Sequence, residues 1–413
     1  MMTTLARRWR RMVFAGAALL LTLGFGLWWH YALPLSLERV HRELAEQGIA
    51  SRWQDVADRQ LSAAEDLARA DALYAAMESL KHSAAADTLL QWYPPEEVDR
   101  GALTAAYADL DHDAIARIRG ELQAWQHSGI APLQRWLAPS VEDVLLGITE
   151  RRGWARLSEA RARLALTPSE RATAITDIAL LLAVHEEPLI IAMLVDISIA
   201  AIALGAMAEH PDLWNVYGEE FLAIMEPWAQ PSYWQEYMVQ GMLNEMRIAS
   251  ALFDEQGSAR KFTDWTSANG IQIRFSAAQA LRDLGASIHF LRDDQRSLRE
   301  FIQGAAEMDA LIHGDKGWWR RQASYLSQEL VVPLGRVVER WARVSLMYDV
   351  LRHEMGLGPW PEDPWAAAGE GLRRYPEQGP LQRIWSVGPN GIDNGGEWDS
   401  DDIIIHWPEP GGP

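Results

Sequence analysis

The sequence predicts a mainly α-helical protein with an N-terminal transmembrane helix and a small C-terminal β-hairpin cap. Three observations predict it: a basic N-terminus precedes an uncharged apolar stretch, helical periodicity runs through most of the chain, and the composition shifts to Gly, Pro, Trp and Asp after Met355. We therefore expect a cytoplasmic basic tail, a transmembrane helix, an extracytoplasmic helical domain and a C-terminal module, at residues 1–11, 12–31, 32–355 and 356–413.

The first two parts set the topology. Residues 1–11 contain four arginines, and residues 12–31 are uncharged and long enough to cross a bilayer as a helix. Arginines stay on the cytoplasmic side, so the rest of the chain is expected in the periplasm, anchored to a bacterial inner membrane. The alternative is a cleaved signal peptide, but no small-x-small cleavage site follows the apolar run, which ends in Trp28-Trp29-His30-Tyr31.

Residues 32–355 have the composition and periodicity of helices joined by short loops. A stripe of apolar residues from Leu334 to Met355 predicts one long amphipathic helix. Two helix starts carry capping chemistry, Ser51 with Gln54 and Thr167 with Glu170. No fixed repeat period is found, so a helical-hairpin bundle and a degenerate α-solenoid both remain open.

A second apolar stretch, Leu189 to Ala208, is also long enough to raise the question of a membrane span. Asp196 lies at its centre, and no Lys or Arg flanks it to fix an orientation. Because an Asp at the middle of a span costs about 2.5–3.5 kcal/mol, we interpret this stretch as a buried core helix.

Composition and motifs disfavour several function classes. The chain has no cysteine, which excludes disulfides and thiolate chemistry, and its net charge of −19 repels nucleic acid. His185-Glu186-Glu187 and His353-Glu354 begin like a zinc-peptidase signature, but neither has the second His one turn later. No catalytic residue is predicted. Most of the 20 tryptophans are expected in the core, with Trp318-Trp319-Arg320-Arg321 as an exception.

The C-terminal tail contains the most specific signals. Leu381 to Val387 and Ile403 to Trp407 are predicted strands of a hairpin. Five carboxylates lie in the loop between them, with no basic residue between Arg383 and His406. Calcium, which takes six to eight oxygen ligands, would relieve their mutual repulsion; a solvated acidic loop is the alternative. The five are Asp393, Glu397, Asp399, Asp401 and Asp402.

Three blocks of the tail resemble the C-terminal end of the major pseudopilin of type II secretion systems. They are Pro361-Glu362-Asp363-Pro364-Trp365, Ile384-Trp385-Ser386-Val387-Gly388-Pro389-Asn390-Gly391, and Asp401-Asp402-Ile403 with Trp407. The resemblance covers about fifty residues and implies a loop that binds calcium and fastens the terminal strands. It implies as ligands the carbonyl of Val387 and the side chains of Asn390, Asp399, Asp401 and Asp402; Asp393 is a further candidate.

The resemblance does not extend to the N-terminus. Prepilins have a Gly-Phe junction before the apolar helix, whereas Gly24-Phe25 lies inside it, so prepilin-peptidase processing is not expected. The outline of the whole chain also resembles bacterial membrane-anchored helical proteins that end in this tail. We therefore expect a non-enzymatic envelope protein with a helical partner-binding domain and a calcium-stabilised hairpin. A periplasmic hydrolase using carboxylates, and an accessory component of a type II secretion or pilus-like assembly, are the alternatives.

Overall fold

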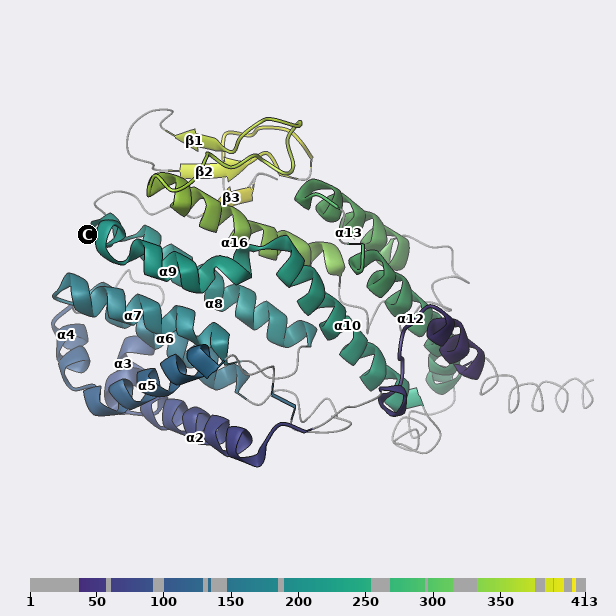
Figure 1. Ribbon diagram of the computed structural model, residues 1–413, viewed down its shortest axis with the longest axis horizontal. Coiled ribbons are helices and arrows are strands. Elements are labelled where there is room, and N and C mark those ends of the chain that lie inside the picture. Colours follow the sequence, from purple (N-terminus) through teal and green to yellow (C-terminus); the bar gives the residue numbers. More distant parts are fainter. Residues whose placement is uncertain are drawn as a thin grey trace, which may run out of the picture.

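The structure is a computed structural model. It describes residues 37–56, 61–91, 100–128, 133–134, 147–184, 189–253, 268–293, 296–314, 333–375, 383–388, 390–396 and 403–405. The predicted anchor at 12–31, the His185-Glu186-Glu187 motif and the Trp318-Trp319-Arg320-Arg321 cluster lie outside these residues. The described part is mainly helical, with a small antiparallel sheet from the C-terminal end of the chain (Figure 1), as the sequence predicts.

The helices follow one another along most of the chain. An unlabelled helix covers residues 37–46. The others are η1 (Trp53–Asp55), α2 (Ala64–Lys81), α3 (Ala84–Leu90), α4 (Arg100–Ala108), α5 (His112–Ser128), α6 (Ile148–Leu164), α7 (Pro168–Leu180), η4 (Leu181–Ala183), α8 (Ile190–Ala208), η5 (Pro211–Leu213), α9 (Trp214–Ala229), α10 (Pro231–Phe253), α12 (Ala268–Leu291), α13 (Leu298–His313) and α16 (Leu334–Glu354).

Helix α8 is the central helix of this body. It contacts α6, α7, α9 and α10, which precede or follow it closely in the sequence, and also α16, which begins only at Leu334. Contacts of this kind are typical of a bundle, since a solenoid limits each repeat to its sequence neighbours. Within the described residues, α8 is also the one helix long and apolar enough to cross a membrane. Its packing on five helices agrees with the interpretation as a core helix.

Large aromatic side chains fill the space between the helices. Trp154, Trp234 and Trp341 are almost completely buried. Ring contacts continue from Trp234 through Trp341 to Phe301, at centroid distances of 6.3 and 6.1 Å. For these rings the structure agrees with the expectation that tryptophan is mainly a core residue here.

The predicted helix starts have different outcomes. Thr167 caps α7 in a full capping box, with its side chain accepting from the Glu170 N–H and Glu170 accepting from the Thr167 N–H. The prediction that Ser51 starts a helix with Gln54 is wrong. Only the three-residue turn η1 follows, and the Ser51 hydroxyl bonds His41 Nδ1 at 2.7 Å instead. A tertiary partner thus takes the side chain that a cap would need.

The C-terminal sheet has the order β1-β2-β3 and is antiparallel throughout. Its strands are β1 (Arg373–Tyr375), β2 (Arg383–Ser386) and β3 (Ile403–Ile405). The hairpin of β2 and β3 was predicted, whereas β1 was not, because Arg-Arg-Tyr has no apolar run and pairing with β2 makes it a strand. Ile384 and Ile405 join the same apolar core as the helices, and β3 contacts α16.

Candidate functional site

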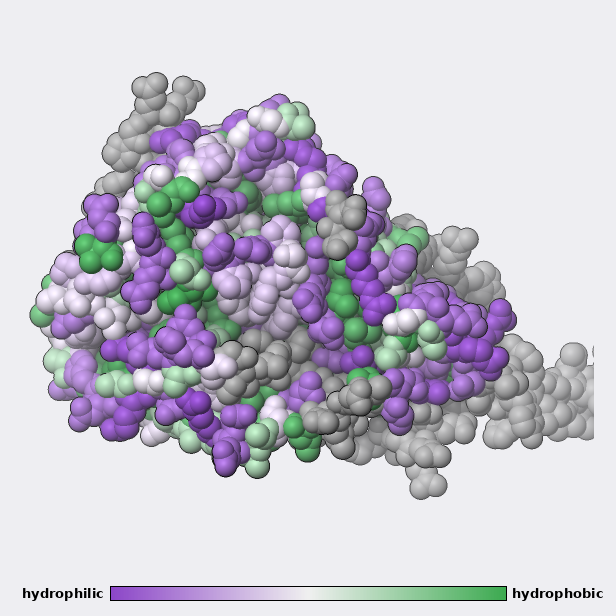
Figure 2. Space-filling model, viewed as in Figure 1, coloured by the Kyte–Doolittle hydropathy of each residue, from purple (hydrophilic) through white to green (hydrophobic). Residues whose placement is uncertain are grey.

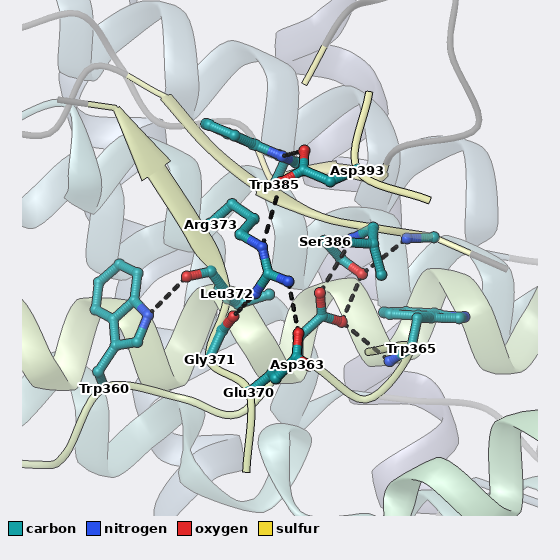
Figure 3. Close-up of polar contacts among 12 residues, drawn as sticks. Trp360, Asp363, Trp365, Glu370, Gly371, Leu372, Arg373, Trp385, Ser386 and Asp393 are labelled. Carbon is teal, nitrogen blue, oxygen red and sulfur yellow. Dashed lines mark hydrogen bonds and ion pairs between the residues drawn. The ribbon is translucent and has the colours of Figure 1, made fainter. Parts of the chain in front are cut away.

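Asp363 is the central residue of the C-terminal cap, by which we mean residues 356–396 and β3. Its side chain is fully buried. Oδ1 accepts from the Trp365 N–H at 2.9 Å and the Ser386 hydroxyl at 2.6 Å, and Oδ2 accepts from the Val387 N–H at 3.0 Å (Figure 3). A buried carboxylate with donors on both oxygens holds its segments firmly, because the Ser386 and Val387 donors would otherwise be buried without a partner.

This carboxylate joins two parts of the chain that the sequence separates by about twenty residues. The Asp363-Pro364-Trp365 turn and the end of β2 belong to different blocks of the pseudopilin resemblance, and they meet at this one side chain. The backbone carbonyl of Asp363 also accepts from Arg299 of α13 at 3.0 Å. The cap is therefore fastened to the helical body through the same residue that fastens its strand.

Asp393 is the one predicted carboxylate ligand within the described residues. Its Oδ1 accepts from the Trp385 ring N–H and from the Gly395 N–H, both at 2.9 Å. Its Oδ2 lies 3.3 Å from Nε of Arg373. The hydrogen bond from Trp385, with smaller contributions from the Gly395 N–H and Arg373, lowers the pKa of Asp393 below its ordinary value. Asp393 therefore folds back onto β1 and β2 as an ionised group (Figure 3).

Arg373 is the basic residue that sequence reasoning missed. It lies in β1, outside the interval from Arg383 to His406, and strand pairing brings it opposite Trp385. Besides Asp393, it contacts Glu370 at 2.7 Å. The acidic loop thus has a counter-cation supplied by a neighbouring strand. The only sequence signal for it was the Arg-Arg pair itself, which has no periodicity that would predict a strand.

Two further predicted ligands lie at the turn after β2. Val387 is buried, and its N–H is bonded to Asp363. The Asn390 side-chain oxygen accepts from the Ile392 N–H at 2.8 Å, and the Gly391 N–H donates to the Gly388 carbonyl at 3.1 Å. Both residues therefore belong to one compact turn, near the stem of the acidic loop.

The remaining predicted ligands, Asp399, Asp401 and Asp402, lie outside the described residues. Within the described residues, no group of three or more His, Asp and Glu side chains is placed to hold a metal ion. A calcium ion bound through Oδ2 of Asp393 would compete with Arg373 for that oxygen. The complete ligand set stays a prediction. For Asp393, calcium binding depends on whether the ion can compete with Arg373.

Replacing Arg373 with Gln tests this condition. If Asp393 is a ligand, removing its competing cation should tighten calcium binding by about threefold to fivefold, since an exposed ion pair is worth up to about 1 kcal/mol. Calcium affinity is measured by titration calorimetry on the full chain, and Arg374→Gln in the same strand is the matched control. An unchanged affinity in the Arg373 variant would remove Asp393 from the ligand set.

Among the described residues, the helical body contains two more fully buried carboxylates. Asp196 of α8 pairs through Oδ1 with Arg151 of α6, and its Oδ2 accepts from the Tyr237 hydroxyl at 2.7 Å. Burial, followed by the nearby Asp196, raises the pKa of Tyr237 well above its ordinary value, so it stays a hydrogen-bond donor. This group joins α6, α8 and α10 in the centre of the bundle.

Asp177 of α7 is the second. Arg119 of α5 binds it in a bidentate manner, at 2.6 and 2.9 Å, and Arg161 of α6 contacts it at 2.9 Å. Two guanidinium groups around one carboxylate give strong, directional pairing. Asp177 therefore joins three helices, as Asp196 does, and has no oxygen without a cationic partner.

His353, from the second partial zinc-peptidase motif, lies at the end of α16. Its Nδ1 is 3.1 Å from the Gly358 carbonyl, and its ring contacts Trp360 edge-on at 5.2 Å. The residue closes the turn between α16 and the cap.

No family profile, curated protein or solved structure matches this chain.

Proposed function

We propose that this chain is a non-enzymatic, membrane-anchored protein of the bacterial envelope that acts by binding a protein partner. Its N-terminus would lie in the cytoplasm and its helical body in the periplasm, with calcium stabilising the C-terminal cap. The proposal rests on the fully buried carboxylates among the described residues, Asp177, Asp196 and Asp363, all of whose oxygens are bonded to partners within the protein.

A catalytic acid or base needs at least one oxygen that can reach a substrate. Each oxygen of these three carboxylates instead accepts from a named donor, and the donors come from elements that the carboxylate joins. Their role is to fix helix and strand positions. A rigid body built in this way is suited to presenting a binding surface.

A broad hydrolase screen of the purified full chain tests the non-enzymatic assignment. We expect no turnover above buffer. An activity that disappears on one substitution in the helical body, in a variant with unchanged circular dichroism, would contradict the proposal and favour a periplasmic hydrolase.

Calcium is proposed as a structural ion for the cap. Extracytoplasmic calcium modules bind at about 10⁻⁴–10⁻³ M, so the site would fill outside the cytoplasm and stay empty inside it. At about 10 mM calcium, such a site would stabilise the cap by about 1.4–2.7 kcal/mol through mass action. Because Asp363 and Arg299 connect the cap to α13, this gain should extend to the contact between the sheet and the body.

We expect calcium binding to the full chain in detergent, and its loss in the Asp401→Ala, Asp402→Ala double variant. The helical body should keep its melting temperature in that variant, because these residues belong to the loop between β2 and β3. Titration calorimetry measures the binding, with magnesium as the control ion. Equal calcium binding by both proteins, or no binding by the wild type, would contradict the proposed calcium site and favour a solvated acidic loop.

A role in a secretion-type or pilus-like assembly is the second candidate. It rests on the sequence resemblance of the tail, two blocks of which meet at Asp363 in this chain. Copurification of the anchored chain with components of such an assembly would support it. Copurification that survives deletion of the cap would argue that the cap is not the contact.

A further inference from the structure

The first described segment, residues 37–56, is packed into the helical body; we call it the strap. Val40, Leu44 and Ile49 in the strap are almost completely buried. Leu44 lies directly against Gly285 of α12, where an added Cβ would be 2.4 Å from a Leu44 methyl group. Gly285 therefore allows a close approach of the strap helix to α12.

Polar contacts fix the strap at several points. Ser250 of α10 lies 3.3 Å from Nε2 of His41, and Arg247 donates to the Ala50 carbonyl at 3.0 Å. Arg292 donates to the Gly48 carbonyl at 3.3 Å, and Arg282 pairs with Glu43 at 3.2 Å. These partners lie about 200 or more residues away in the sequence, on α10 and α12 or in the turn that ends α12.

The strap follows the proposed membrane anchor closely in the sequence. Only residues 32–36 separate the proposed anchor, residues 12–31, from the first described residue of the strap helix, residue 37. Five residues span at most about 17 Å when fully extended. With the proposed anchor in a membrane, residue 37 stays within that distance of the end of the anchor, and α10 and α12 cannot move away from the strap without breaking the contacts above.

We infer that the body rests on the lipid headgroups with the end formed by the strap and α12. This inference rests on the membrane anchor of the proposed function. It adds the orientation of the helical body relative to the membrane. Figure 1 places the strap, in dark purple, beside α12 at one end of the body, and α4 at the other. The α4 end would then point away from the bilayer, toward the periplasmic space.

The chemistry of the described strap residues fits headgroup contact. Exposed strap residues alternate in charge, with Arg39 and Arg42 beside Glu38 and Glu46. Figure 2 shows hydrophobic residues scattered among hydrophilic ones, without a broad apolar face, on the side it displays. Contact should therefore depend on the anchor and persist in zwitterionic lipid, with little dependence on salt.

The absence of native cysteine makes a direct test practical, because one introduced Cys is a unique labelling site. Ala286→Cys on α12 and Ala105→Cys on α4 are matched variants, since both alanines are exposed and helical. The full chain, labelled with a fluorescent donor, is placed in phosphatidylcholine nanodiscs that contain an acceptor on the headgroup. Energy transfer is measured at low and high salt.

We expect transfer at position 286 to exceed that at position 105 by about twofold or more, since α8, which lies between the two ends, alone is about 28 Å long. In the His41→Ala, Leu44→Ala variant the two values should converge, while helical content is kept. Equal transfer at both positions in the wild type would overturn the inference.

A separate readout distinguishes failure of the anchor from failure of the orientation. If the chain does not copurify with the nanodiscs, both the anchor and the orientation are wrong. If it copurifies and transfer at the two positions is equal, the anchor stands and the body is held on a loose tether. If the double variant does not fold, the wild-type ratio alone decides between a resting and a tethered body.

Discussion

Replacing Asp196 with Leu should destabilise the protein by about 3–5 kcal/mol, because Arg151 would remain buried without its counter-charge. Arg151 and Asp196 are both almost inaccessible to solvent, and Tyr237 would lose its acceptor as well. The measurement is thermal and urea unfolding of the full chain in detergent, followed by circular dichroism. This substitution should have the largest effect in the helical body.

The double variant Arg151→Met, Asp196→Leu is the control. Removing both charges leaves no isolated ion, so most of the lost stability should return. A single variant that unfolds within about 1 kcal/mol of the wild type would mean that the Arg151 guanidinium finds water or another acceptor in the interior. In that case the pair would not be a main connection between α6 and α8.

Replacing Asp363 with Ala should release the cap from the body. The Ser386 hydroxyl and the N–H groups of Trp365 and Val387 would lose their acceptor, two of them in buried positions, at a cost of about 2–3 kcal/mol. The loss should be local, because these donors all belong to the cap. Hydrogen exchange measures it: β2 should lose protection while α8 keeps it.

Glu362→Ala is the matched control, since Glu362 is the neighbouring carboxylate and is exposed. It should leave exchange in β2 unchanged. Equal loss of protection in β2 and α8 after Asp363→Ala would contradict a local role and would mean that the cap and the body unfold as one unit. Unchanged protection in both would mean that the sheet holds without this carboxylate.

Periodicity and capping signals predicted a large part of the fold. The apolar stripe from Leu334 to Leu351 is buried in α16, whereas Met355, its last predicted member, caps the helix and is half-buried. The Thr167-Pro168 start is a capping box, and the two apolar runs of the tail are paired strands. These features follow from interactions between residues a few positions apart, or from one buried face of an element, and a sequence displays both.

The candidate site was predicted only in part, because its decisive contacts join separate elements. Arg373 neutralises Asp393 from a strand that has no apolar pattern of its own. Asp363 belongs to a sequence block of the pseudopilin resemblance. Its role as the hydrogen-bond acceptor for Ser386 and Val387 depends on how the turn meets β2. The sequence shows that this region is rich in acidic residues. Which residues these carboxylates contact is decided by strand pairing in the folded chain.

By itself, the sequence determined the helical class, the central apolar helix with its Asp196 and the acidic composition of the C-terminal loop. It also excluded disulfides and thiolate chemistry, because the chain has no cysteine. Only the tertiary structure decided how charge is satisfied. Arg151 lies 45 residues before Asp196, and Arg119 lies 58 residues before Asp177. Such pairs leave no periodic trace, because a buried ion selects its partner by distance in the folded core and not by position along the chain.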